Sequence, residues 1–495
     1  MSRSRPLASA STALVAGLCA FLGILTLLLK LRALHYWQYT SDLFTFDQML
    51  GETLRGRFGL EYTYGDQFGE HAYLTLLLLL PLKLALKTRF VYVLAALTPL
   101  AYGACGLMLL RAFREPSAPW KAPLAAFLFL ANAGVLSGLL EDYYGFHPDI
   151  AASFIGVVFA ALLAREHDRR EAGPAPWPLY AAFALMVASK EDFALSACAA
   201  LALLALRGVR RARPLLLASA GALALELLLV ASRQTLFNRT DAALAREWWS
   251  QPRWPPVGVA YWTPWLLLGA VLLGALAVEG ELDLFAGALL VMAASRLPGS
   301  LLTADFNPAS WHNLPTAVFL MGAVMLQLVR GRRRGSAVLA AALAAALGLD
   351  LFARRLPPLL GALTRSGRVE AFQALQADLQ TVIARTEPGS VTAIPLMTAM
   401  EWARAGRRFS FYPRGVTVSP AGIARYAVLL RGRPPEGVAA YAEPADEDPR
   451  ARLSSCYRAL AQSAAFLLYE RSEPCPELDE SRARFVRRFG AGSIR

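Results

Sequence analysis

Residues 39–73, YTSDLFTFDQMLGETLRGRFGLEYTYGDQFGEHAY, form a polar, acidic and aromatic stretch between two very hydrophobic segments. Six side chains in this stretch can exchange protons, coordinate metal ions or bind sugar hydroxyls: Asp42, Asp47, Gln48, Asp66, Glu70 and His71. A long loop between membrane spans is more often functional than structural. We therefore expect the function to depend on this loop and on the side of the membrane where it lies.

The composition predicts a membrane protein. Of the 495 residues, 56% are hydrophobic and 18% are charged, whereas a soluble domain has about 25% charged residues. Apolar runs long enough to cross a bilayer recur through the first 353 residues, which predicts about eleven spans. The expected spans are residues 9–30, 90–110, 122–140, 148–164, 178–189, 192–206, 214–232, 262–278, 281–297, 313–329 and 335–353.

Short basic loops predict which side of the membrane each connection occupies. Lys and Arg in short loops mark the cytoplasmic side. Because the net charge of +13 collects in these loops, nucleic-acid binding is not expected. We predict a multi-pass protein of the inner (cytoplasmic) membrane, with its N-terminus in the cytoplasm and its C-terminal part outside. The loops assigned to the cytoplasm contain Arg111, Arg165, Arg207 and Arg330.

The number of crossings before the Arg111 loop must be even, because both ends of this segment are predicted to be cytoplasmic. Three apolar runs lie there, and the shortest, residues 72–86, contains Pro81 and Lys83. We predict that this run is a re-entrant or juxtamembrane helix within a long first outer loop, residues 31–89. The same argument splits residues 178–206 into two short helices that meet on the outer side.

Beyond a transmembrane domain of residues 1–355, the pattern changes to alternating helix and strand. This alternation predicts a small soluble α/β domain, residues 356–495, outside the membrane. Helices are expected at 369–389, 397–405 and 451–462, and strands at 390–396, 426–430 and 464–471. Cys456 and Cys475 lie in this domain, and an oxidising compartment would favour a disulfide between them.

By this topology, the polar side chains collect on the outer side. The second outer loop contains Glu141, Asp142, His147 and Asp149, the third contains Lys190, Glu191 and Asp192, and other outer positions hold Arg233, Arg296 and His312. For a single charge in an outer loop, a solvated surface position is the simpler explanation. The triplet at 190–192 differs because it interrupts an apolar stretch, and ionisable groups near membrane depth tend to mark sites or structural ion pairs.

These residue types predict a particular chemistry. A carboxylate near the membrane surface can deprotonate an acceptor hydroxyl. Several carboxylates and a His can bind a divalent cation that neutralises a phosphate leaving group. Arg233, Arg296 and Lys190 could bind that phosphate directly. The pattern therefore predicts a lipid-phosphate-linked substrate that is processed at the outer face.

Four motifs, in this order, resemble a widespread family of uncharacterised prokaryotic membrane proteins. They are DLFTFDQ at Asp42–Gln48, His71 with the apolar run that follows it, Phe146-His147-Pro148, and Lys190-Glu191-Asp192. The resemblance covers about residues 35–330. The second motif departs from the family pattern, because Ala72 and Leu74 replace the usual Phe and Pro.

That family is similar in layout to the GT-C class of integral-membrane glycosyltransferases, which use polyprenyl-phosphate-linked sugars and a carboxylate base. The resemblance implies that Asp42, or less favourably Asp47, is the base. It also implies that Glu141, Asp142 and His147 hold a divalent cation (Mg²⁺ or Mn²⁺) or orient the donor. The expected substrate-binding residues are Gln48, His71, Lys190, Glu191, Asp192, Arg233, Arg296 and His312.

Two other classes of function compete with this hypothesis. A transporter or flippase would need charges within its spans or inverted repeats. The sequence shows a charge near the middle of a span only at Glu226, and no repeat. A non-catalytic envelope protein could use its outer domain for binding, but the polar outer loops disfavour this alternative.

Overall fold

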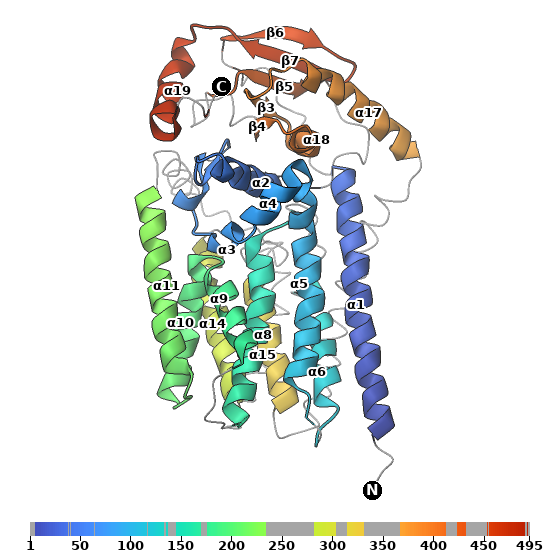
Figure 1. Ribbon diagram of the computed structural model, residues 1–495, viewed down its shortest axis with the longest axis vertical. Helices are drawn as coiled ribbons and strands as arrows, with labels where there is room; N and C mark the ends of the chain where they lie inside the picture. The colour runs from blue at the N-terminus through green and yellow to red at the C-terminus, as the bar shows by residue number, and fades with distance from the viewer. Residues whose placement is uncertain are drawn as a thin grey trace.

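The computed structural model has two layers, a bundle of long helices and a sheet domain, with a platform of short elements between them (Figure 1). Helix α1 (Arg5–His35) begins at the end of the bundle away from the sheet. The residues that the structure describes are 5–37, 39, 41–63, 65–115, 117–132, 135–136, 145–169, 176–233, 282–302, 314–330, 367–411, 423–431, 453, 455–490 and 493.

Hydrophobic helices build the bundle, and four segments of the described chain are long and apolar enough to cross a membrane: Ala10–His35, Leu80–Ala112, Pro148–Arg169 and Ala212–Arg233. The protein is therefore a multi-pass helical membrane protein. The predicted spans at 262–278 and 335–353 lie outside the described residues, and each of the others overlaps a bundle helix. These helices are α1 (Arg5–His35), α5 (Phe90–Ala112), α6 (Lys121–Leu130), α8 (Pro148–Arg169), α9 (Trp177–Val187), α10 (Glu191–Leu206), α11 (Ala212–Arg233), α14 (Leu284–Leu302) and α15 (Leu314–Arg330).

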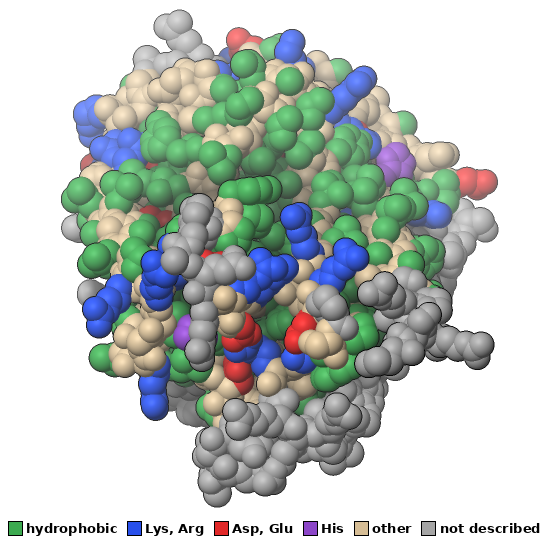
Figure 2. Space-filling model, turned by 60° about the horizontal axis from the view of Figure 1, so that its bottom comes forward, with side chains coloured by type: hydrophobic (Ala, Val, Ile, Leu, Met, Phe, Trp, Pro, Cys, Tyr) green, Lys and Arg blue, Asp and Glu red, His purple; other side chains and the backbone are tan. Residues whose placement is uncertain are grey.

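The basic loops gather at one end of the bundle. Arg165 donates a hydrogen bond to the carbonyl of Arg111 at 2.6 Å, and Arg211 pairs with Glu166 at 3.2 Å. Arg330, the last residue of α15, pairs with an aspartate in the last turn of α8. Figure 2 shows Lys and Arg side chains on this end of the molecule. The loops thus share one side, as the basic pattern predicts, and the assignment of that side to the cytoplasm stays a prediction.

The platform lies at the opposite end of the bundle, under the sheet domain (Figure 1). Its elements are α2 (Ser41–Leu54), β1 (Leu60–Glu61), β2 (Gly65–Asp66), η1 (Gln67–Gly69), α3 (Leu74–Leu77), α4 (Leu80–Leu86) and η2 (Lys87–Arg89). The run 72–86, expected to be one helix, is divided into α3 and α4. Pro81 explains the break because it occupies the first turn of α4, where the missing backbone N–H would have no helical partner anyway.

The sheet domain is a mixed α/β layer. Its strands are β3 (Val391–Ile394), β4 (Arg408–Phe411), β5 (Tyr426–Leu430), β6 (Tyr457–Gln462) and β7 (Phe466–Arg471), in the spatial order β4-β3-β5-β7-β6. Strands β4, β3 and β5 run parallel, and β5, β7 and β6 run antiparallel. The helical elements are α17 (Gly367–Ala384), η3 (Leu396–Thr398), α18 (Ala399–Arg404) and α19 (Pro476–Phe489).

One segment of this domain was predicted wrongly. Residues 451–462 were expected to be helical, but residues 457–462 form strand β6 at the sheet edge. The Ala- and Leu-containing sequence has a good helix propensity, but pairing with β7 overrides it. Strand β4 and helix α19 were not predicted at all. A disulfide joins Cys456, which precedes β6, to Cys475, which precedes α19.

The sheet domain shares one hydrophobic core with the platform and the end of α1. The rings of Trp37 and Phe372 lie 5.0 Å apart, and Trp37 Nε1 donates to Glu401 at 3.1 Å. Gln48 Oε1 accepts a hydrogen bond from the backbone N–H of Phe409 at 3.3 Å. Residues on both sides of the predicted domain boundary at 355/356 therefore pack into one hydrophobic core.

Candidate functional site

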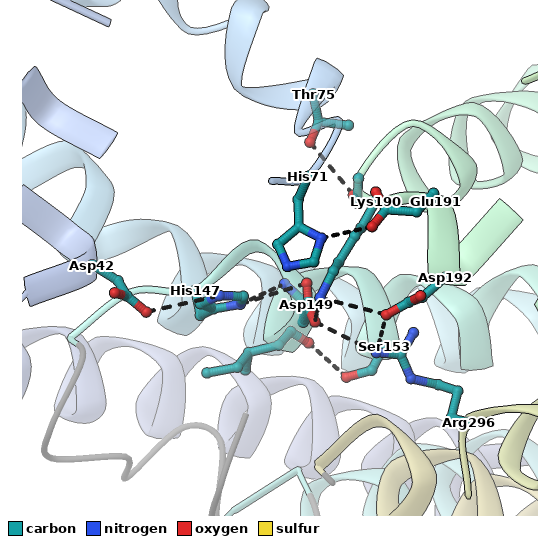
Figure 3. Close-up of polar contacts among 12 residues, drawn as sticks. Asp42, His71, Thr75, His147, Asp149, Ser153, Lys190, Glu191, Asp192 and Arg296 are labelled. Carbon is teal, nitrogen blue, oxygen red and sulfur yellow. Dashed lines mark hydrogen bonds and ion pairs between the residues drawn. The ribbon is translucent and has the colours of Figure 1, made fainter. Parts of the chain in front are cut away.

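Polar side chains from several elements meet where the platform covers the bundle (Figure 3). Asp42 comes from α2, His71 from the loop after η1, and His147 from the residue before α8. Asp149 lies at the start of α8, residues 190–192 lie at the start of α10, and Arg296 lies within α14. The residues of this polar cluster are Asp42, His71, His147, Asp149, Lys190, Glu191, Asp192 and Arg296.

Asp149 is the centre of the polar cluster and is completely buried. Its Oδ2 atom lies 3.4 Å from Lys190 Nζ and 3.4 Å from Arg296 Nη2. An unpaired buried charge would be very costly, and two neighbouring cations offset that cost. Burial by itself lowers the pKa of Lys190, but Asp149 and Asp192 more than compensate and hold this pKa above its usual value.

The local sequence places these charges at helix starts. Asp149 lies in the first turn of α8, and Glu191 and Asp192 lie in the first turn of α10. Carboxylates are favoured there because the first backbone N–H groups of a helix lack helical partners. Lys190 has an extended backbone just before α10. The predicted break between two short helices near Lys190 is confirmed, because α9 ends at Val187.

His147 lies between two carboxylates. Its Nε2 atom is 3.8 Å from Asp42 Oδ2, and its Nδ1 atom is 3.5 Å from Asp149 Oδ1. The rings of Phe46 and Tyr73 pack edge-on against the imidazole, which limits its movement. Asp42 keeps 17% of its side chain exposed, whereas Asp149 has none. The polar cluster therefore has an accessible carboxylate at one edge and a buried one inside.

Glu191 ties the platform to the bundle. One of its carboxylate oxygens lies 2.6 Å from His71 Nδ1, and the other accepts a hydrogen bond from the backbone N–H of Ala72 at 3.1 Å. Because both carboxylate oxygens of Glu191 bind residues 71–72, Glu191 is suited to position this loop. His71 and Glu191, both predicted to bind substrate, thus contact each other directly.

The second candidate base, Asp47, lies apart from the polar cluster. Asp42 and Asp47 are five positions apart on α2, so their side chains leave the helix in directions about 140° apart. Asp47 Oδ1 lies 2.6 Å from Lys83 Nζ, and 8% of the Asp47 side chain is exposed. Burial raises the pKa of Asp47, and Lys83 only partly opposes this effect. The geometry therefore favours Asp42 as the accessible carboxylate of α2.

Two predicted substrate-binding residues also lie elsewhere. Gln48 binds the backbone of the sheet domain through its hydrogen bond with Phe409. Arg233 pairs with Asp66 at 2.7 Å, and its guanidinium lies 5.3 Å from the ring centroid of Phe58. Arg233 thus fixes α11 to the platform. His312 lies outside the described residues.

The predicted metal ligands are only partly described, because Glu141 and Asp142 lie outside the described residues. Within the described part of the chain, no group of three or more His, Cys, Asp or Glu side chains is placed to hold a metal ion. Lys190 and Arg296 already neutralise Asp149, and two cations at that position would repel a divalent ion. These side chains do not fit a metal at Asp149, and the divalent cation stays a prediction.

Gly145 supports the loop that carries His147. Its φ is +72°, and a Cβ atom there would lie 2.7 Å from Tyr39 Cγ. Its carbonyl oxygen also accepts a hydrogen bond from Lys30 Nζ at 2.9 Å. A side chain at residue 145 would therefore have to displace either Tyr39 or the loop.

We expect Gly145→Ala to lower the melting temperature and to disturb the contact between His147 and Asp42. A strained backbone costs about 1–3 kcal/mol, and the clash with Tyr39 adds to it. Gly208→Ala is the matched control, because Gly208 has φ +75° but open space around the Cβ position. Thermal unfolding in detergent measures both variants, and equal shifts would show that the contact with Tyr39 does not matter.

Comparison by sequence gives no match, and comparison with solved structures gives a distant one. The sequence matches neither a protein-family model nor a curated protein. Among solved structures, the chain is similar to the crystal structure of ArnT from Cupriavidus metallidurans bound to undecaprenyl phosphate. The TM-score is 0.47 with 10% sequence identity, over 92% of this chain and 98% of that chain. At this level the similarity carries no conclusion about activity.

Proposed function

We propose that the protein is a membrane glycosyltransferase that moves a sugar from a polyprenyl-phosphate donor to an acceptor hydroxyl at the outer face of the membrane. One observation carries the proposal. The accessible carboxylate of Asp42 is linked, through His147 and Asp149, to the cations Lys190 and Arg296. One end of the polar cluster can accept a proton, and the other can bind a phosphate.

Asp42 acts as the general base in this proposal. It takes the proton of the acceptor hydroxyl while the hydroxyl oxygen forms a bond to the anomeric carbon. The bond between that carbon and the phosphate oxygen breaks, and the polyprenyl phosphate leaves with the bonding electrons. The exposed fraction of Asp42 admits an acceptor, whereas Asp47 is held by Lys83.

Arg296 is suited to bind the leaving phosphate. Its Nε and Nη1 atoms are buried, and neither has a hydrogen-bond partner among the described residues. Leaving a buried donor unsatisfied costs about 1–3 kcal/mol, and phosphate oxygens would accept both hydrogen bonds in the geometry that guanidinium favours. The guanidinium also lies 4.3 Å from the ring centroid of Phe193, which holds it in place.

A transporter or flippase is the second candidate because of Glu226. This residue of α11 is completely buried, and neither carboxylate oxygen has a hydrogen-bond partner within the described part of the chain. Buried carboxylates in spans often mark transport paths. Transport would depend on Glu226 and not on Asp42, which is the reverse of what sugar transfer requires. A non-catalytic envelope protein would depend on neither carboxylate for any turnover.

A donor panel tests the proposal. The full-length protein in lipid nanodiscs is incubated with polyprenyl-phosphate-linked sugars that carry a radiolabel on the sugar, together with a membrane extract that supplies acceptors. We expect the label to leave the donor lipid, and Arg296→Gln to slow this release about 10²- to 10³-fold, as removal of a charge-stabilising donor does.

Arg210→Gln is the matched control, because Arg210 lies in the basic loop at the other end of the bundle, where it lines a separate cavity. This variant should release label at the parental rate. The proposal is wrong if no donor loses its label to the folded protein, or if Arg296→Gln folds and keeps the full rate.

A further inference from the structure

A cavity of about 310 Å³ lies beside α2, between α4 and the sheet domain. Residues of α2, α4 and η2 form one wall, and residues from the end of α18 to β4 form the other. None of its lining residues belongs to the polar cluster. Its charged lining residues are five cations and two carboxylates: Arg55, Lys83, Lys87, Arg407, Arg408, Asp47 and Glu52.

Positive charge is in excess in this cavity. Asp47 pairs with Lys83 at 2.6 Å. Glu52 pairs with Arg408 at 3.3 Å and also with Arg55. Within the described residues, no carboxylate pairs with Lys87 or Arg407. These two cations come from opposite walls, so an anion in the cavity would be attracted by both of them.

Unsatisfied donors also line the cavity. Gln48 is 9% exposed, its Oε1 atom accepts the hydrogen bond from Phe409, and its Nε2 atom has no partner among the described residues. Arg407 Nη1 is likewise buried without a hydrogen-bond partner there. Both groups are donors, so a ligand that binds them must offer acceptors. Excess positive charge and unsatisfied donors together specify an oxyanion, and the volume lies at the lower end of the range for small-molecule sites.

The position of the cavity indicates where the anion comes from. Helix α4 exposes Leu82, Leu84 and Leu86 while it buries Lys83. Leu84 also lines the cavity, together with Leu54 of α2, which is exposed as well. The platform lies at the end of the transmembrane bundle (Figure 1), where side chains with an apolar stem and a charged head are favoured. An apolar approach that leads to a cationic cavity suits a lipid with a phosphate headgroup.

We propose that this cavity is a second binding site, which takes the phosphate headgroup of an anionic membrane lipid between Lys87 and Arg407. The headgroup pairs with a cation from each wall and so holds the sheet domain on the platform. The site is separate from the donor-phosphate site at Arg296. The proposal therefore does not depend on the glycosyltransferase assignment.

Thermal unfolding of the full-length protein tests this site. One arm compares nanodiscs of phosphatidylglycerol with nanodiscs of phosphatidylcholine, and a second adds inorganic phosphate to the protein in a neutral detergent. We expect phosphatidylglycerol to raise the melting temperature by about 2–4 °C, because a ligand that binds only the folded state stabilises it. A rise with inorganic phosphate alone would support the phosphate site and assign it to a free anion. No rise in either arm overturns the proposal.

Variants locate the effect. Lys87→Gln and Arg407→Gln should each abolish the rise, and Lys87 is exposed, so its variant is expected to fold. Arg210→Gln, at the other end of the bundle, should keep the full rise. If Lys87→Gln keeps the rise, or if Arg296→Gln removes it, the anion binds outside this cavity and the proposal is wrong.

Discussion

Asp42→Asn is expected to lower sugar transfer by about 10²- to 10⁴-fold, the usual contribution of general acid–base catalysis. The amide keeps the size of the side chain but cannot accept the proton of the acceptor hydroxyl. The variant should remain folded, because Asp42 lies at the edge of the polar cluster and 17% of its side chain is exposed. Release of labelled sugar from the donor lipid measures the rate, and thermal unfolding in detergent measures the fold.

Asp47→Asn is the matched control for this prediction, because it makes the same change on the same helix. It removes the partner of Lys83, so we expect a lower melting temperature and little change in transfer per folded molecule. The assignment of the base fails if Asp42→Asn transfers sugar at the parental rate. If Asp47→Asn is the variant that loses transfer while remaining folded, Asp47 is the base instead.

Lys190→Met should destabilise the fold strongly, with a loss on the order of 3–5 kcal/mol, as expected when one partner of a buried ion pair is removed. Methionine fills a similar volume but leaves the buried Asp149 with less compensating charge. Arg296 and His147 remain near the Asp149 carboxylate, so we expect the loss of stability to lie near the lower end of this range. The melting temperature in detergent, compared with the parent, measures the loss.

Two further variants show whether the ion pair causes this effect. Asp149→Asn combined with Lys190→Met should recover much of the lost stability, because the double variant no longer buries an undercompensated carboxylate. Asp192→Asn should change stability by less than about 1 kcal/mol, since 47% of the Asp192 side chain is exposed and water screens its charge. A Lys190→Met protein that melts at the parental temperature would show that Asp149 does not depend on this lysine.

The break before α10 shows how far local reasoning reaches. Basic loops on both flanks require two helices in residues 178–206, and the polar stretch at 189–192 predicts where they meet. The structure has that break. By contrast, the helix expected at 451–462 is largely strand β6, because its partner β7 supplies backbone hydrogen bonds that no local propensity reveals.

The candidate site was also only partly predictable. His147 and Lys190 were proposed from their motifs, and both contact Asp149. By sequence, Asp149 is one charge among several in an outer loop, although its position directly after His147-Pro148, at the start of an apolar run, is a usable signal. The separation of Asp42 from Asp47 depends on which face of α2 meets the bundle, and the sequence of α2 does not reveal that face.

The sequence by itself determined that this is a multi-pass helical membrane protein with an α/β domain after its spans. The free energy of transferring a run of side chains into lipid is a local property, so it can be read from consecutive residues. Only the tertiary structure decided that Asp42, His147, Asp149, Lys190 and Arg296 meet, and that Asp47 lies apart from them, where it pairs with Lys83 and lines the cavity beside α2. These contacts join helices far apart in the chain, and helix packing, which depends on all the partners at once, sets their distances.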